Sequence, residues 1–208
     1  MIRAVIFDMD GVVIDSEPLH FIATKQLLKR YGKDFSWEDH MKFTGTTEEY
    51  TWSTLAKKLD IKKDYKKLME EKTKIFVKLI ETEGKPIPGA IKLIKKLRGK
   101  KLLALASNSP HAHVAAVLNR LHLQDVFDVV LYEKDITHPK PHPEIYLKTA
   151  ERLNVKPEEC IVIEDSLVGI EAAKKAHMHC IGIASSFKKE ELKEVDCVLK
   201  SIDEFKME

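Results

Sequence analysis

The chain has 208 residues, 44% of them hydrophobic and 33% charged, which is enough apolar material for the core of one large domain or of a domain with a sizeable insertion. Its 35 Lys and Arg nearly balance 33 Asp and Glu, and the charges alternate along expected helices, so the composition predicts neither nucleic acid nor a membrane as partner. The first apolar run, Ala4–Phe7, is too short for a signal peptide, and the three cysteines lack metal-like spacing, so we expect a cytoplasmic protein with reduced thiols. The sequence carries no signal for the oligomeric state, and a monomer is the default expectation.

The N-terminal part predicts one strand followed by helices. Arg3–Phe7 is rich in Val and Ile, which indicates a buried strand. Thr46-Thr-Glu-Glu49 has the pattern of a capping box at a helix start. The prolines of Lys85–Gly89 then break the chain. We expect helices at Glu17–Tyr31, from Thr46 to Leu59 and at Asp64–Thr82, so that residues 15–84 form an all-helical insertion.

After this break the pattern changes to short apolar strands that alternate with amphipathic helices. We expect strands at Lys101–Ala106, Asp128–Leu131, Cys160–Ile163 and His179–Ile183, with helices at Ala90–Leu97, His111–Leu121, Pro143–Leu153 and Leu167–Ala176. Such alternation requires parallel crossovers. It therefore predicts an α/β fold: a doubly wound parallel sheet of residues 1–14 and 85–208, with the helical insertion as a second domain.

Polar residues follow the strands of this predicted sheet. Ligands bind beyond the carboxyl ends of the strands in open parallel sheets, so these residues are expected at one site. They are Asp8 and Asp10 after the first strand, Ser107 and Asn108 after the second, Lys140 between two prolines, and Glu164 and Asp165 after the fourth. Each has a plain structural explanation alone, such as a turn or a helix cap, but their convergence at one edge favours a site.

The chemistry that this set favours is phosphoryl transfer. A carboxylate can attack phosphorus, and Asp8, closest to the strand, suits the nucleophile. Asp10 could protonate the leaving oxygen and then deprotonate water. Lys140 would supply positive charge, and Ser107 with nearby backbone N–H groups would supply hydrogen bonds, so we expect Ser107, Asn108 and Lys140 to bind the phosphate. Glu164 and Asp165 are expected to hold a Mg²⁺ ion, which prefers carboxylates, water and phosphate oxygens.

Four stretches together, FDMDGVVIDSE, LASNSP, KPHPEIY and IEDSLVGIEAAK, resemble the haloacid dehalogenase-like hydrolase superfamily, in its branch of beta-phosphoglucomutases and sugar phosphatases. They occur in the family's order over essentially the whole chain. The resemblance implies a Rossmann-like core, a mobile helical cap at 15–84, Asp8 as nucleophile and Asp10 as acid and base. It also implies one Mg²⁺ held by Asp8, the Asp10 carbonyl and Asp165, with Glu164 as a ligand or as an orienting residue. Asp10 argues against a dehalogenase.

The resemblance leaves phosphatase and mutase as alternatives. Beta-phosphoglucomutases have a pattern similar to Lys-Gly-x-x-Arg in the cap loop that binds a second phosphate. By the resemblance, this chain has Thr44 at the lysine position of that loop, followed by Gly45, Thr47 and Glu48. Glu48 stands at the arginine position and is expected to repel a phosphate dianion, which favours a phosphatase of small phosphorylated metabolites, sugar monophosphates in particular. His20 matches a cap-hinge histidine of the mutases and favours the other reading.

Two further interpretations, a phospho-receiver and a zinc site, are disfavoured. A phospho-receiver also combines acids, a hydroxyl residue and a lysine on a parallel sheet, but it lacks the Asp-x-Asp pattern and a helical cap, so a non-enzymatic switch is disfavoured. The pairs His111, His113 and His138, His142 suggest zinc only at first sight. Residues two apart on a helix do not share a face, and neither pair has the acids or cysteines of a closed site, so no zinc is expected there.

Overall fold

The computed structural model describes residues 1–43, 46–184 and 195–205. The chain forms two compact units, one made of Met1–Asp15 with Lys85–Glu208 and the other of Ser16–Gly84. Two of the predicted substrate residues, Thr44 and Gly45, lie outside the described residues.

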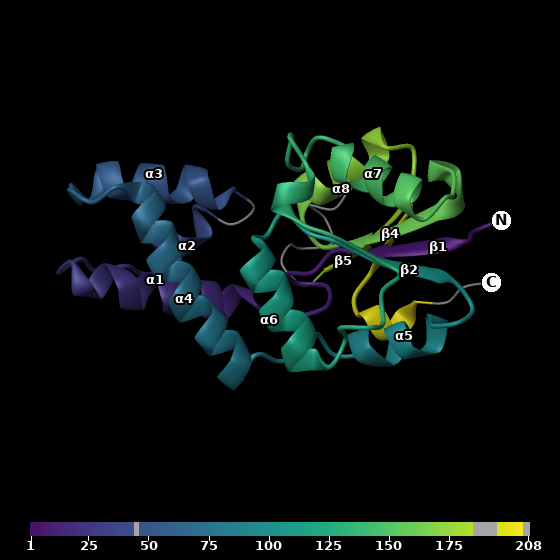
Figure 1. Cartoon of the computed structure of the whole chain (residues 1–208), viewed down its shortest axis with the longest axis horizontal. Helices are drawn as coiled ribbons and strands as arrows, with labels where there is room; N and C mark the ends of the chain where they lie inside the picture. The colour runs from purple at the N-terminus through teal and green to yellow at the C-terminus, as the bar shows by residue number, and fades with distance from the viewer. Residues whose placement is uncertain (44–45, 185–194, 206–208) are drawn as a thin grey trace. The chain divides into compact units, whose positions relative to one another are not determined.

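The first unit is built on a six-stranded sheet in the order β3-β2-β1-β4-β5-β6, in which every neighbouring pair is parallel. The predicted doubly wound fold is therefore confirmed. In Figure 1, α7 and α8 lie over one face of the sheet and α5 and α6 over the other. The strands are β1 (Ala4–Phe7), β2 (Leu102–Ala106), β3 (Val129–Leu131), β4 (Cys160–Glu164), β5 (His179–Ile183) and β6 (Cys197–Leu199), and the helices are α5 (Ala90–Leu97), α6 (His111–Leu121), α7 (Glu144–Arg152) and α8 (Leu167–Lys175).

The central strand β1 sets the position of the site. All four of its residues are fully buried, as expected for a strand covered by helices on both faces. Phe7 is in register with Leu105 of β2 and with Ile163 of β4, so the three strands end at the same level. The strand order also reverses direction at β1, because β2 and β3 lie on one side of it and β4 to β6 on the other. Open sheets bind ligands at such a point.

The connections to the helical unit leave and return side by side. Asp15 donates its backbone N–H to the carbonyl of Lys85 at 3.0 Å, and Ile87 donates to Val13 at 3.1 Å. Ile14 and Pro86 form an antiparallel bridge between them. Within the first unit, the two strand-like segments that flank the insertion are thus tied together.

The second unit is helical throughout its described regular structure. It packs a cluster of apolar side chains that includes Leu28, Trp52 and Leu68. Its helices are α1 (Glu17–Arg30), α2 (Trp37–Met41), α3 (Glu48–Lys58) and α4 (Tyr65–Glu83). The described residues of the first unit also form short 3-10 turns at Glu133–Asp135, Pro157–Glu159 and Ile202–Glu204.

Three local expectations need correction. The sequence did not predict α2, which begins with a capping box between Ser36 and Asp39 and is too short to show a helical period. Nor did it predict β6, a three-residue strand. The cap of α3 is Thr47, one residue later than predicted, because its hydroxyl accepts the backbone N–H of Tyr50 while Thr46 donates to Phe43.

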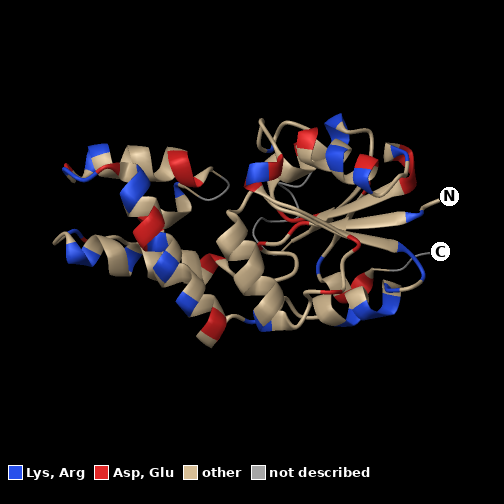
Figure 2. Cartoon of the chain, viewed as in Figure 1, with Lys and Arg blue, Asp and Glu red and all other residues tan. Residues whose placement is uncertain are grey.

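The surface charge is mixed, as expected. Figure 2 shows both signs of charge on α3, α4 and α7, whereas α5 and α6 carry no Asp or Glu. Among the described residues, no helix combines the length and apolar character needed to cross a membrane. The cysteines form no disulfide; Cys160 and Cys180 are buried, and Cys197 is exposed.

Candidate active site

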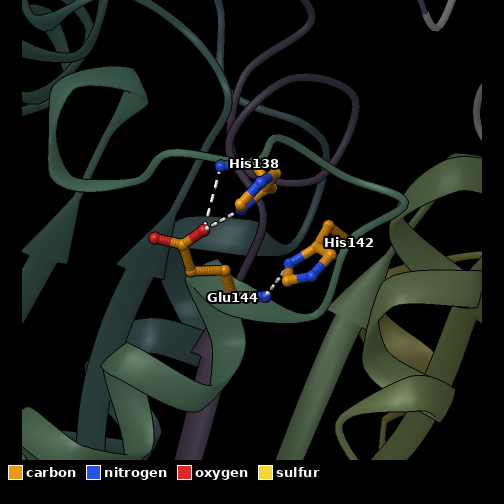
Figure 3. Close-up of side chains that lie close together, drawn as sticks. All are labelled: His138, His142 and Glu144. Carbon is orange, nitrogen blue, oxygen red and sulfur yellow. Dashed lines mark hydrogen bonds and ion pairs between the residues drawn. The ribbon is translucent and has the colours of Figure 1, made fainter.

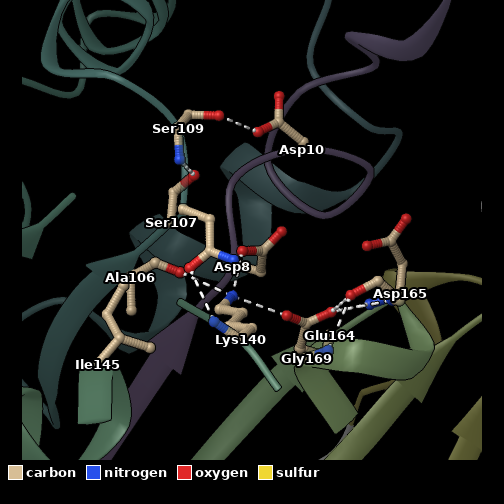
Figure 4. A network of polar contacts seen from close by, with 12 residues as sticks. Asp8, Asp10, Ala106, Ser107, Ser109, Lys140, Ile145, Glu164, Asp165 and Gly169 are labelled. Carbon is tan, nitrogen blue, oxygen red and sulfur yellow. Dashed lines mark hydrogen bonds and ion pairs between the residues drawn. The ribbon is translucent and has the colours of Figure 1, made fainter. Parts of the chain in front are cut away.

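Lys140 is the centre of a buried polar cluster at the carboxyl ends of the central strands (Figure 4). Its Nζ lies 2.5 Å from Oδ1 of Asp8, 2.8 Å from Oε1 of Glu164 and 3.0 Å from the carbonyl oxygen of Ala106. Asp8, Lys140 and Glu164 are all buried. Three residues that are far apart in the sequence therefore form one charge cluster, and the ammonium group uses its three N–H bonds on these three acceptors.

The segment that carries Lys140 is held by its surroundings. Its backbone N–H donates to Oδ1 of Asn108 at 3.2 Å, and its ammonium group lies 4.8 Å from the ring centroid of Tyr146. Pro139 and Pro141 restrict the backbone on both sides. Asn108 thus fixes the backbone of Lys140, and the phosphate contact expected of Asn108 stays a prediction.

Glu164 accepts five hydrogen bonds. Its Oε1 accepts from Lys140 and from the hydroxyl of Tyr146 at 2.9 Å, and its Oε2 accepts from the backbone N–H groups of Asp165 and Ser166 and from the Ser166 hydroxyl, each at 2.9 Å. A carboxylate has about four lone-pair positions, so these donors occupy its acceptor capacity. This geometry supports Glu164 as the residue that orients Lys140.

The buried charges alter one another's protonation. Burial raises the pKa of Asp8 to about 8, with Glu164 and Asp10 adding to the rise and Lys140 opposing it. Burial would lower the pKa of Lys140, but the charges of Asp8 and Glu164 outweigh it and raise this pKa. Burial likewise opposes ionisation of Glu164, yet Lys140 and the Ser166 hydrogen bonds hold its pKa below the usual value. Lys140 therefore opposes the rise in the pKa of Asp8 but does not cancel it, and ionisation of this buried carboxyl group at neutral pH calls for further positive charge.

Asp8, Glu164 and Asp165 form an acidic cluster that is compatible with a metal site. Each offers a carboxylate oxygen, and the three atoms lie within 4.8 Å of one another. All three residues are buried, and such a donor set of oxygen atoms suits Mg²⁺. The carboxylate of Asp10 is not a member of this group; the resemblance had assigned the carbonyl of Asp10, not its side chain, to the metal.

Asp10 extends above the buried cluster toward the second strand (Figure 4). Its Oδ2 accepts a hydrogen bond from the hydroxyl of Ser109 at 2.9 Å. The backbone N–H of Ser109 in turn donates to Oγ of Ser107 at 3.0 Å, and Ser107 is buried. Asp10 is only half-buried, so its carboxyl group has more access to solvent than Asp8, which suits a group that exchanges protons with water.

The sequence analysis assigned no role to three residues of this cluster. Ser109 binds Asp10, Tyr146 binds Glu164, and Gly169 lies directly against the Glu164 carboxylate. All three lie in the family-like stretches LASNSP, KPHPEIY and IEDSLVGIEAAK. Their occurrence in these stretches was the only sequence signal that they belong to the site. The contacts of Tyr146 and Gly169 with Glu164 depend on tertiary packing, which the local sequence pattern does not reveal.

Replacing Gly169 by Ala is expected to destabilise the fold by displacing Glu164, the residue that contacts Lys140. A Cβ atom built at Gly169 would lie 1.6 Å from Oε1 of Glu164, so the carboxylate would have to move away from Lys140 and Tyr146. We expect a loss of about 2 kcal/mol in the free energy of unfolding, as for overpacked cores. Urea unfolding of Gly169→Ala measures it. The matched control is Gly99→Ser, since no atom lies within 4 Å of a Cβ there, although its φ of 76° adds some strain. A stability of Gly169→Ala equal to that of the native chain would contradict this account.

The helical unit has its own buried charge. Lys72, 1% exposed, forms an ion pair with Oε1 of Glu48, and its Nζ lies 2.7 Å from Nδ1 of His20. Oε2 of Glu48 accepts the indole N–H of Trp52 at 2.9 Å. The His20 ring stacks on Phe76 with centroids 4.0 Å apart. Because an ammonium group only donates, Nδ1 of His20 acts as the acceptor.

This ion pair corrects one premise of the sequence analysis. Glu48 was expected to present negative charge, but its charge is compensated by Lys72 within the helical unit. Thr47 is exposed and uses its hydroxyl to cap α3. The predicted roles of His20, Thr47 and Glu48 in substrate selection stay predictions.

Replacing Glu48 by Gln is expected to destabilise the helical unit. The change leaves the buried Lys72 without its counter-ion, and loss of one partner of a buried pair costs about 3 kcal/mol. Thermal and urea unfolding measure the loss, and Glu70→Gln on an exposed position of α4 is the control. The double variant Glu48→Gln/Lys72→Met is expected to recover most of the loss, because it removes both charges. Equal stabilities of Glu48→Gln and Glu70→Gln would contradict the pairing.

Comparisons with known proteins agree on one family. A family profile described as haloacid dehalogenase-like hydrolase matches residues 5–183. A phosphorylated carbohydrates phosphatase of Thermotoga maritima is 40% identical over 84% of this chain and 81% of its own length. A beta-phosphoglucomutase of Bacillus subtilis is 30% identical over 87% of this chain and 83% of its own. The crystal structure of CbbY from Rhodobacter sphaeroides in complex with phosphate has a TM-score of 0.86 and 30% identity, covering 98% of this chain and 96% of that one.

Proposed function

The chain belongs to the haloacid dehalogenase-like hydrolase family, and from this premise we propose that it is a Mg²⁺-dependent phosphatase of small phosphorylated metabolites, most of all sugar monophosphates. The observation that carries the proposal is the contact of Asp8 with Lys140 at the carboxyl end of the central strand. A carboxyl group so placed has a cation beside it that favours its ionised form, and it is fixed at the end of a rigid strand. Such a group suits nucleophilic attack on phosphorus.

The first half-reaction is attack by Asp8. One of its oxygens forms a bond to phosphorus while the bond from phosphorus to the sugar oxygen breaks, which gives an aspartyl-phosphate. Asp10 donates a proton to the leaving oxygen, so the sugar departs as a neutral alcohol. Lys140 contacts Oδ1 of Asp8 and offsets the negative charge that gathers on the phosphoryl group.

The second half-reaction returns Asp8 to its starting state. Asp10 is now a base that removes a proton from water, and the water oxygen attacks phosphorus. The bond between phosphorus and Asp8 breaks, and inorganic phosphate leaves. Ser109, whose hydroxyl donates to Asp10 at 2.9 Å, is proposed to orient Asp10, and Glu164 is proposed to orient Lys140.

Asp8 and Asp165 are the residues proposed to hold one Mg²⁺, with the Asp10 carbonyl as a third ligand. Bound there, the ion would neutralise phosphoryl oxygens and lower the repulsion between phosphate and the acidic cluster. Glu164 is proposed to act behind this set, because its oxygens are occupied by five donors.

A beta-phosphoglucomutase is the second candidate, favoured by the relative of that name and by His20. A mutase must hold a second, non-reacting phosphate. We propose that the cap does not provide for it, because Glu48 replaces the expected arginine and occupies Lys72. The cap residues His20, Thr44, Gly45, Thr47 and Glu48 are proposed to choose among monophosphates.

A screen for phosphate release tests the proposal. With Mg²⁺ present, we expect inorganic phosphate from several sugar monophosphates and no need for a bisphosphate primer. The mutase alternative predicts conversion of beta-glucose 1-phosphate to the 6-phosphate, dependent on a bisphosphate and with little free phosphate. A receiver-like switch predicts single phosphorylation without turnover. Nucleotides and glycerol phosphates in the same screen delimit the substrate class.

Asp10→Asn is expected to slow both half-reactions. An amide neither donates to the leaving oxygen nor removes a proton from water, and loss of general acid–base catalysis costs roughly 10²- to 10⁴-fold in rate. Phosphoenzyme is expected to accumulate when dephosphorylation becomes the slower step, and acid quench with labelled substrate measures it. Asp15→Asn makes the same change at a nearby exposed position, so it serves as the control and should retain the native rate. A normal steady-state rate for Asp10→Asn would remove its proposed role.

A further inference from the structure

The segment that carries Lys140 also presents two imidazoles and a carboxylate outside the acidic cluster. The sequence His138-Pro-Lys-Pro-His-Pro-Glu144 has proline at every second position. Lys140 is buried, whereas His138 and His142 on either side of it are exposed. Proline fixes φ and restricts the residue before it, so this backbone loses little freedom when its side chains bind a ligand.

Glu144 is held firmly by the loop. Its Oε1 accepts the backbone N–H of Thr137 at 2.9 Å and pairs with Nζ of Lys148 at 2.7 Å. Its Oε2 accepts the backbone N–H of His138 at 2.9 Å. The Lys148 and backbone hydrogen bonds keep the pKa of Glu144 far below its usual value. The carboxylate is therefore anionic and oriented, as the hydrogen-bonded carboxylates of metal sites are.

The two histidines gather at this carboxylate (Figure 3). Nδ1 of His138 lies 3.0 Å from Oε2 of Glu144, and Nδ1 of His142 accepts the backbone N–H of Glu144 at 3.3 Å. The two rings are 4.7 Å apart between centroids. One ligand atom from each of the three residues lies within 4.8 Å of the other two. The sequence pattern predicts no zinc ligand beside this histidine pair, but the fold brings the carboxylate of Glu144 to it.

We propose that His138, His142 and Glu144 bind a divalent transition-metal ion of the zinc type. Two imidazoles and one carboxylate form a ligand set that zinc uses when it keeps open positions for water. The ion would replace the proton shared between Nδ1 of His138 and Oε2 of Glu144. Two ligand atoms of a tetrahedral zinc ion with bonds of about 2.1 Å lie roughly 3.4 Å apart, so Nδ1 of His138 and Oε2 of Glu144, now 3.0 Å apart, need only a small separation to bind the same ion. The exposed rings can rotate to complete the set.

This site differs in chemistry from the acidic cluster. That cluster offers only carboxylate oxygens, which suit Mg²⁺, whereas imidazole nitrogen favours zinc, nickel and copper over magnesium. Both sites meet at Lys140, which lies between the two histidines in the sequence and contacts Asp8. An ion at the histidines would join the Lys140 loop to the first residue of α7 and stiffen it.

Calorimetric titration of Zn²⁺ into the full chain, in saturating Mg²⁺, tests the proposal. We expect one zinc ion per chain and a rise in the thermal unfolding temperature. His138→Ala and His142→Ala should each weaken binding on the order of 100-fold, at least as much as the loss of a residue that only supports a ligand. The binding readout does not depend on turnover, so its failure is separate from a failure of the proposed phosphatase activity.

Three variants separate this site from other zinc ligands. His111→Ala, from the histidine pair on α6, and Cys197→Ser, the exposed thiol, should bind zinc as the native chain does. Asp165→Asn removes a carboxylate of the acidic cluster and should also leave the zinc affinity unchanged. Loss of binding in Asp165→Asn with full binding in both histidine variants would overturn the proposal, as would the absence of zinc binding in the native chain.

Discussion

Asp8→Asn is expected to abolish turnover while the fold stays intact. An amide oxygen cannot form the aspartyl-phosphate, and loss of a covalent nucleophile costs roughly 10⁴-fold or more in kcat. The amide has nearly the shape of the carboxylate, and its oxygen can still accept from Lys140, which contacts Oδ1 of Asp8 at 2.5 Å. Phosphate release under substrate saturation measures the rate. Asp125→Asn, an exposed position in the turn before β3, is the control.

The stability of the same variant gives an independent test. The folded-state pKa of Asp8, about 8, exceeds its ordinary value of 3.8 because burial disfavours the charge. An acid whose pKa is raised on folding contributes stability at low pH, and this contribution is lost as the pH rises from 3.8 through 8. In metal-free buffer, Asp8→Asn should therefore be more stable than the native chain near pH 8, and the difference should shrink toward pH 4. Substantial residual turnover, or a stability gain that grows on acidification, would contradict the assigned role of Asp8.

Lys140→Met is expected to damage both stability and activity. Lys140 is the cation that both Asp8 and Glu164 contact, so the change leaves two buried carboxylates facing each other. Breaking a buried ion pair by removal of one partner costs about 3–5 kcal/mol. The phosphoryl group also loses a preorganised positive donor, which lowers kcat by roughly 10³-fold. Urea unfolding and phosphate release measure the two effects.

The controls for Lys140 use a surface lysine and a double variant. Lys175→Met removes an exposed partner of Glu171 on α8 and should change stability by less than about 0.5 kcal/mol. Lys140→Met/Glu164→Gln should be more stable than Lys140→Met alone, because one of the two unbalanced charges is removed. Additive losses in the double variant would mean that Lys140 and Glu164 do not act as a pair.

The sequence predicted the sheet and the edge at which the polar residues gather. Short apolar strands alternating with amphipathic helices have few solutions other than a parallel sheet, and α5 and α6 begin and end at the predicted residues. Asp8 and Glu164 reach the same level because β1 and β4 are in register, which follows from strands of similar length that end in polar residues. The convergence of the site was thus accessible from strand ends alone.

Contacts made by helix faces were not accessible in the same way. Tyr146 and Gly169 act on Glu164 from α7 and α8, and nothing in their local pattern distinguishes a residue that contacts a carboxylate from one that fills the core. Glu48 and Lys72 are 24 residues apart in the sequence and lie on different helices. The sequence therefore indicated the charge of Glu48 but not that Lys72 compensates it. Periodicity predicts which face of a helix is buried but not which polar atom meets which.

The paired segments around Ile14 and Pro86 make the helical unit exchangeable. Because the chain leaves the sheet at Asp15 and returns at Lys85 through adjoining, hydrogen-bonded positions, whatever lies between them only has to bring its two ends together. A lineage can therefore lengthen, shorten or replace this stretch without altering strand order or register. Such a change would leave the residues proposed to carry out phosphoryl transfer in their places on the sheet.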